Sequence, residues 1–139
     1  MGVGGPRTAS DGKGRVLIVD DDATIRRALT RELSGEFEVV HAVDYADAVR
    51  CLAECADICA VVSDCNLGSG PSGIALMKYV CQTAPHLPRI TLSGEDPDEI
   101  RRELIATGVA SDVIAKPWLG GAVLGAVKRH LLQSSVQGS

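Results

Sequence analysis

The stretch VLIVDDD, residues 16–22, decides the fold of this chain. Its four apolar residues form a continuous run, rich in β-branched side chains, as in a parallel strand buried on both faces. Three carboxylates follow directly, and like charges this close repel unless a cation, a shared proton or open water relieves them. Asp22 is explained as the N-cap of a following helix. Asp20 and Asp21 require another explanation.

Length and composition limit the number of domains and the possible classes of function. With 139 residues, the chain is long enough for one domain with a hydrophobic core and too short for two. Its net charge of −4 argues against direct nucleic-acid binding, which normally uses a basic face. The sequence contains neither an apolar run long enough to span a membrane nor the core of a signal peptide. We therefore expect a cytoplasmic protein that does not bind membranes.

The cysteines are odd in number and contain no CxxC pair, so their spacing matches no strong metal or redox motif. Small, buried and reduced thiols are the favoured interpretation, with a metal or redox site as the weaker alternative. The five residues are Cys51, Cys55, Cys59, Cys65 and Cys81.

One pattern repeats along residues 15–132. Five short apolar runs begin near residues 15, 37, 59, 88 and 111, and a helical pattern follows each. Strands that alternate with helices at this interval predict βαβ units and a doubly wound parallel sheet. Residues 1–14 are predicted to be a flexible leader, and residues 133–139 a disordered tail.

The helices carry start signals of their own. Asp44 is a predicted cap, Gly73 begins the third helix, and Asp96 followed by Pro97 is typical of a cap and first turn. The fifth helix, expected over about residues 119–132, is weakened by three glycines.

Side chains suited to one chemistry stand at the carboxyl ends of four of the five predicted strands, where functional groups of a doubly wound sheet collect. Acidic oxygens from two strands are the ligands that Mg²⁺ prefers. A carboxylate beside a cation can attack phosphorus, and a lysine and a hydroxyl at the same edge can hold phosphoryl oxygens. These side chains are Asp20, Asp21, Asp64, Ser93 and Lys116.

The segments VLIVDDD, VVSDCNL, ITLSG and IAKPW resemble the receiver domain of two-component response regulators, over about residues 15–132. The resemblance implies a (βα)₅ flavodoxin-like fold, a five-stranded parallel sheet in the order 2-1-3-4-5 with helices on both faces. It also implies a phosphoacceptor signalling domain rather than an enzyme. Such a domain takes a phosphoryl group from a histidine kinase or a phosphotransfer protein and changes conformation to control a partner or output. A homodimer through the fourth helix, fifth strand and fifth helix belongs to the same expectation.

The resemblance assigns roles residue by residue. Asp64 stands at the phosphoacceptor position, and Ser93 and Lys116 stand at the positions that contact the phosphoryl group. Pro117 follows the lysine as in the family, typically across a cis peptide bond. The implied cofactor is Mg²⁺, held by Asp20, Asp21, Asp64 and the backbone carbonyl of Asn66.

Two features depart from the family pattern. In the loop after Asp64, Gly68 stands where a proline is usual, and Gly73 comes one residue later than the usual glycine. The loop is therefore expected to be longer and looser. Val113 stands where many relatives have a Tyr or Phe that moves inward on activation.

VDDDATI also fits the haloacid-dehalogenase phosphatases, with Asp20 as nucleophile and Asp22 as general acid. Thr24, Ser93 and Lys116 would supply the remaining motif residues. However, no acidic residue follows the lysine, and the carboxylate at the end of the third strand has no role in that arrangement. We keep this reading as the alternative.

Overall fold

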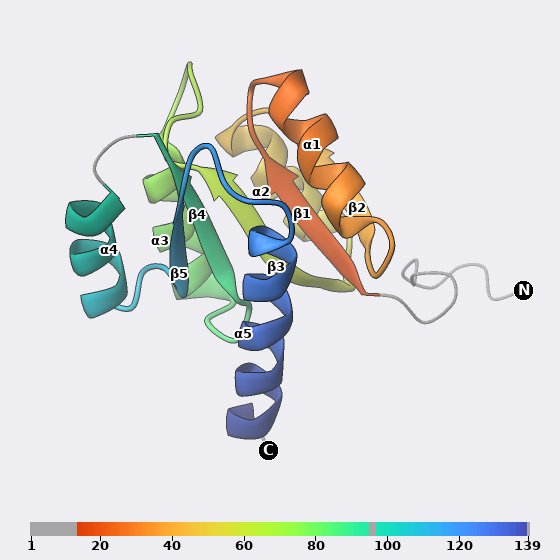
Figure 1. The fold of residues 1–139 in the computed structure, drawn as a ribbon, viewed down its shortest axis with the longest axis vertical. Coiled ribbons are helices and arrows are strands. Elements are labelled where there is room, and N and C mark those ends of the chain that lie inside the picture. The colour runs from red at the N-terminus through yellow and green to blue at the C-terminus, as the bar shows by residue number, and fades with distance from the viewer. Residues whose placement is uncertain (1–13, 95–96, 139) are drawn as a thin grey trace, which may run out of the picture.

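The computed structural model describes residues 14–94 and 97–138. Most of the predicted leader and the predicted cap Asp96 lie outside these residues. Strands and helices alternate strictly along the chain (Figure 1). The elements are β1 (Arg15–Val19), α1 (Ala23–Leu33), β2 (Glu38–Ala42), α2 (Tyr45–Glu54), β3 (Ile58–Asp64), α3 (Gly73–Thr83), β4 (Arg89–Ser93), α4 (Pro97–Ala106), β5 (Asp112–Ala115) and α5 (Ala122–Gly138).

The strands form one parallel sheet in the order β2-β1-β3-β4-β5, which confirms the predicted flavodoxin-like topology. In the register of the sheet, Val19 pairs with Ser63, and Asp64 pairs with Leu92. The carboxyl ends of β1, β3 and β4 therefore meet at one edge of the sheet, and the residues that follow these strands are brought together there.

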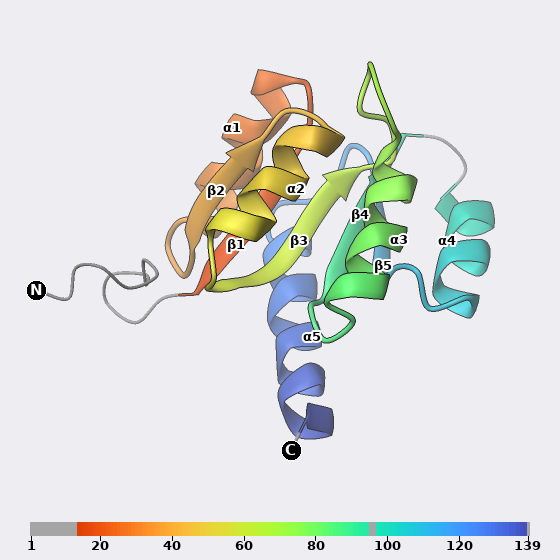
Figure 2. The same ribbon diagram turned by 180° about the vertical axis from the view of Figure 1, so that it is seen from behind.

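The sheet buries both of its faces. Leu17, Val19 and Val61 pack with residues of α2 and α3 on one face. Val16 and Ile18 point to the other face and pack with residues of α1 and α5. Figure 2 shows α2 and α3 in front of the sheet with α5 behind it. All five residues of β1 are buried, and for residues 16–19 this is what the unbroken apolar run predicts.

In the described part of the chain, the residue just before the helix caps α1, α2 and α3 through its side chain. The Asp22 carboxylate accepts a hydrogen bond from the Thr24 N–H at 2.8 Å, and the Asp44 carboxylate accepts one from the Asp47 N–H at 2.9 Å. Both caps were predicted from the sequence. Ser72, which was not predicted, caps α3.

The fifth helix differs from its prediction at both ends. It begins at Ala122 rather than near residue 119, because Gly121 has a φ of +90°, which is incompatible with a right-handed helix. It continues to Gly138, so residues 133–138 are a helical extension and not the disordered tail expected from their polar composition. That extension contains no proline to interrupt the helix.

None of the helices in the described part of the chain is long and apolar enough to cross a bilayer. The five cysteines are free thiols that are buried or half-buried, in agreement with their expected packing role.

Candidate functional site

Three carboxylates converge at the carboxyl edge of the sheet, as predicted. Asp20 and Asp21 follow β1, and Asp64 ends β3. One carboxylate oxygen from each lies within 4.8 Å of the others. Asp20 and Asp64 are buried, whereas Asp21 is exposed. Such a cluster of carboxylate oxygens suits a hard divalent cation such as Mg²⁺.

The surroundings of Asp20 fit a bound cation. Its Oδ1 accepts a hydrogen bond from the Asp22 N–H at 2.9 Å, but its Oδ2 is buried without a hydrogen-bond partner among the described residues. The pKa of Asp20 is raised to about 6, chiefly because the side chain is buried. The Asp22 N–H and the Lys116 charge oppose this rise, while the charges of Asp64 and Asp21 add to it. A divalent cation would satisfy the orphaned oxygen and relieve the repulsion.

Lys116 brings a positive charge to the same edge from the end of β5. Its Nζ lies 3.1 Å from Oδ2 of Asp64. Its backbone N–H donates to the carbonyl of Ser93 at 2.8 Å, which fixes the start of the following loop against β4. The peptide bond between Lys116 and Pro117 is cis, as the resemblance implied. Ser93 is the last residue of β4 and is buried.

The segment after β3 approaches two of the acidic residues closely at two glycines. A Cβ at Gly73 would lie 1.6 Å from the backbone oxygen of Asp64, so only glycine fits there. A Cβ at Gly68 would lie 2.6 Å from Oδ2 of Asp21, and the φ of Gly68 is +72°. Gly73, which comes one residue later than the usual glycine of the family, is therefore required for the close approach of the chain to Asp64. Asn66 is exposed in this loop, and its role as a carbonyl ligand stays a prediction.

Val113, at the position of the family's mobile aromatic residue, is fully buried. It packs with Leu104 and Ala110 between α4 and β5. The structure therefore places a small core side chain where a ring would be expected to change position.

Sequence reasoning missed a second charged cluster, at the amino end of β5. The buried Asp112 carboxylate contacts Arg101 at 3.1 Å, Arg129 at 2.8 Å and His130 at 3.2 Å. Burial acts to raise the pKa of Asp112, but the hydrogen bonds from His130, Arg129 and the Val113 N–H, together with the Arg101 charge, hold that pKa below its usual range. The sequence gives no local signal for this cluster, because Asp112 is 11 residues from Arg101 and 17 residues from Arg129 along the chain.

Comparison with known proteins agrees with this site. The sequence matches the response regulator receiver domain over residues 16–128. It is 29% identical to the hydrogenase transcriptional regulatory protein HoxA of Cupriavidus necator, over 93% of this chain and 26% of HoxA. It is 34% identical to the response regulator protein FleR of Pseudomonas aeruginosa, over 85% of this chain and 24% of FleR. The chain thus spans about a quarter of the length of these curated relatives.

Comparison with solved structures also finds a receiver domain. The crystal structure of the receiver domain of NtrX from Brucella abortus superimposes with a TM-score of 0.77 at 30% identity, covering 84% of this chain and 98% of that domain. The family match covers most of the chain and leaves no support for the phosphatase alternative. The chain therefore belongs to the family of response regulator receiver domains, the phosphoacceptor modules of phosphorelay signalling.

Proposed function

We propose that Asp64 is the residue that accepts the phosphoryl group, from a histidine kinase or a histidine phosphotransfer protein. The observation that carries the proposal is the 3.1 Å contact between Asp64 and Lys116 inside a cluster of three carboxylates. Asp64 is the member of the cluster that touches the lysine, so an incoming phosphoryl group at its carboxylate meets a positive charge.

In the proposed transfer, a carboxylate oxygen of Asp64 forms a bond to phosphorus while the bond between phosphorus and the donor's imidazole nitrogen breaks. The electron pair of that bond stays on the imidazole nitrogen. The ammonium of Lys116 and the hydroxyl of Ser93 would donate hydrogen bonds to the phosphoryl oxygens. Both groups come from the ends of strands, which limits the reorganisation that the transfer requires.

We further propose Mg²⁺ as the cofactor, held by Asp20, Asp21, Asp64 and the backbone carbonyl of Asn66. When bound, the ion would supply positive charge that offsets the charge of the carboxylates and of the incoming phosphoryl oxygens. The orphaned Oδ2 of Asp20 supports this assignment.

Phosphorylation would then change the conformation of the domain and its binding to a partner or output domain. HoxA is named as a transcriptional regulatory protein, and FleR as a response regulator. We propose that this receiver also controls an output without touching nucleic acid itself, which its net charge of −4 supports.

The α4–β5–α5 face is the proposed contact between two copies of the domain. Ile105 of α4 is 39% exposed and Leu132 of α5 is 69% exposed, so each of the two helices offers an apolar side chain for such a contact. Light scattering of the wild type with and without beryllium trifluoride should show a larger particle in the activated state. Ile105→Glu should abolish the increase, and an unchanged particle size in the wild type would refute the dimer.

The phosphoacceptor proposal is tested with a small phosphodonor and Mg²⁺. Intact mass should show one added phosphoryl group on the wild type, and borohydride trapping should map it to Asp64. Asp64→Asn should remove the label, whereas the matched control Asp22→Asn, which alters only a helix cap, should keep it. Label that persists in Asp64→Asn, or that maps to Asp20, would refute the assignment.

A further inference from the structure

The start of α5 has no capping residue of its own. The helix begins at Ala122 and is preceded by Leu119, Gly120 and Gly121, none of which has a side chain that can accept a hydrogen bond. The first turn of α5 also contains no acidic residue. The Ala122 N–H donates to the carbonyl of Leu119 at 3.0 Å and the Gly125 N–H to the carbonyl of Gly121 at 2.8 Å, so the N–H groups between them need an acceptor from elsewhere in the molecule.

Glu32 of α1 supplies that acceptor. One of its carboxylate oxygens accepts a hydrogen bond from the backbone N–H of Leu124 at 2.8 Å, in the first turn of α5. The other accepts a hydrogen bond from the indole Nε1–H of Trp118 at 2.9 Å. A single side chain thus holds both the helix start and the loop before it, from a position 86 residues before Trp118 and 92 residues before Leu124.

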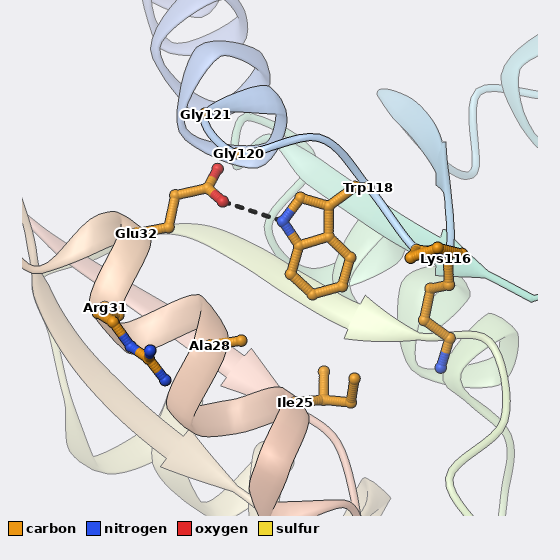
Figure 3. A pocket seen from close by; sticks show the side chains of 9 residues that line it. Ile25, Ala28, Arg31, Glu32, Lys116, Trp118, Gly120 and Gly121 are labelled. Carbon is orange, nitrogen blue, oxygen red and sulfur yellow. Dashed lines mark hydrogen bonds between the residues drawn. The ribbon is translucent and has the colours of Figure 1, made fainter.

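Trp118 lies two residues after Lys116, and its ring stands between Glu32 and the lysine side chain (Figure 3). Lys116 and Trp118 line the same open pocket of about 760 Å³, which Ile25 and Ala28 of α1 line as well. The indole, like Ile25, is partly buried and packs against the core that includes Leu29. The segment 116–121 is therefore fixed at one end by the bond between Lys116 N–H and Ser93 and toward the other by Glu32.

We propose that Glu32 is a positioning residue for phosphoryl transfer, which acts through Trp118 to hold the loop that carries Lys116. The inference rests on the proposed function of Asp64 as phosphoacceptor. Glu32 itself does not touch the acidic cluster in this arrangement. Because transfer rates depend on placement to within about 1 Å, a loop released from Glu32 would present the ammonium less effectively.

The chain offers a matched control for this role. Glu36 lies just after α1 and pairs with Lys128 of α5 at 2.7 Å, so it also links the α1 region to α5. Both side chains of that pair are about half-exposed, and neither belongs to the loop 116–121. If the loss of any carboxylate that links the α1 region to α5 slowed phosphorylation, variants of Glu32 and of Glu36 would both be slow. The proposal expects slow phosphorylation only in the Glu32 variants.

The experiment compares the rate of phosphorylation by a small phosphodonor at saturating Mg²⁺ in four variants of the full chain. Glu32→Ala should slow the reaction about 10-fold. Glu32→Gln should fall in between, because its amide oxygen can still accept one of the two hydrogen bonds. Trp118→Phe should also fall in between, because it loses the indole hydrogen bond but keeps a packed ring and the bond from the Leu124 N–H to Glu32. Glu36→Gln should react like the wild type. Trp118 is the single tryptophan of the chain, so in the three variants that keep it the fluorescence emission reports whether the contact is lost and whether the fold is intact.

The decisive measurement repeats Glu32→Ala in a Lys116→Ala background. If Glu32 acts through the lysine, the double variant should be no slower than Lys116→Ala alone. The inference is overturned if the two losses multiply, or if Glu32→Ala reacts like the wild type while the wild type is labelled at Asp64. Failure of the wild type itself to take label at Asp64 would instead overturn the proposed function.

Discussion

Lys116 and Asp64 form an ion pair across an intervening strand. They lie at the ends of β5 and β3, with β4 between them in the sheet, and the lysine Nζ approaches the aspartate Oδ2 to 3.1 Å. The contact is possible because parallel strands end at the same edge, so a long side chain can reach over the end of the strand between them. The contact links the lysine at the end of β5 to the acidic cluster before any phosphoryl group is present.

Replacing the lysine tests what this pair does. Lys116→Ala should lower the rate of phosphorylation by a small phosphodonor about 100-fold, because a preorganised donor to the transferring group is lost. The change in unfolding free energy should be only about 1 kcal/mol, since the pair is partly open to solvent. Stopped-flow kinetics and urea unfolding separate the two effects. Lys128→Ala, which removes an exposed ion pair on α5, is the control and should leave the rate unchanged.

Removing charge from the acidic cluster should stabilise the metal-free protein. Asp20 is buried, and its pKa is raised to about 6 chiefly by that burial, so an uncharged side chain relieves both desolvation and repulsion. We expect Asp20→Asn to be about 1 kcal/mol more stable than the wild type in chelator. Thermal melts with and without Mg²⁺ check this, since the ion should raise the melting temperature of the wild type much more than that of the variant. A metal-free variant that melts below the wild type would contradict a strained cluster.

The sequence was sufficient for the sheet and the acidic cluster because both follow from local patterns. A run such as residues 16–19 marks a buried strand, and the carboxylates come next to it in the chain. The contact between Glu32 and Trp118 leaves no such pattern, because the two residues meet only after the sheet has brought α1 beside α5. The segment LGGA, residues 119–122, contains no capping side chain at the start of α5. This was the available signal of the Glu32 contact, and it indicates the need for an acceptor without identifying it. Asp112 was missed for the same reason.

Glycine at position 73 should be irreplaceable. Gly73→Ala places a Cβ 1.6 Å from the backbone oxygen of Asp64, so β3 or α3 must shift, and we expect a loss of about 3 kcal/mol or more in unfolding free energy. Gly70→Ala is the control: its φ is +80°, but a Cβ there meets nothing within 4 Å, so the cost should stay near 1 kcal/mol. Urea unfolding of both variants measures the difference. Equal losses would mean that the loop adapts to the added methyl group.

Asp112 should make stability depend on pH in the acid range. Because its pKa is held below the usual range in the folded state, its stabilising contribution is present above the unfolded-state pKa and is lost as pH falls through the folded-state value. Asp112→Asn should therefore lose about 1 kcal/mol at neutral pH, with half-exposed arginine partners limiting the effect. The difference from the wild type should shrink below about pH 4. Urea unfolding across this range tests it, with Glu54→Gln, an exposed pair with Arg50, as a control that should change little. A difference that grows in acid would contradict the assigned direction.

The conformational signal should leave the site through Ser93 and not through the side chain of Val113. Ser93 ends β4 beside the acidic edge, and its hydroxyl can donate to a phosphoryl oxygen. Val113 is fully buried between α4 and β5, and a β-branched side chain is stiff at χ1, so it cannot make the movement of a ring. We therefore expect beryllium trifluoride to shift backbone amide resonances mainly between residues 93 and 100 in the wild type, including the segment 95–96 that lies outside the described residues.

Ser93→Ala should reduce these shifts strongly. Val113→Ala should lower the unfolding free energy by about 1–2 kcal/mol through the cavity it leaves, yet keep most of the shifts. If Ser93→Ala responds like the wild type, or if Val113→Ala alone silences α4, the signal takes another route.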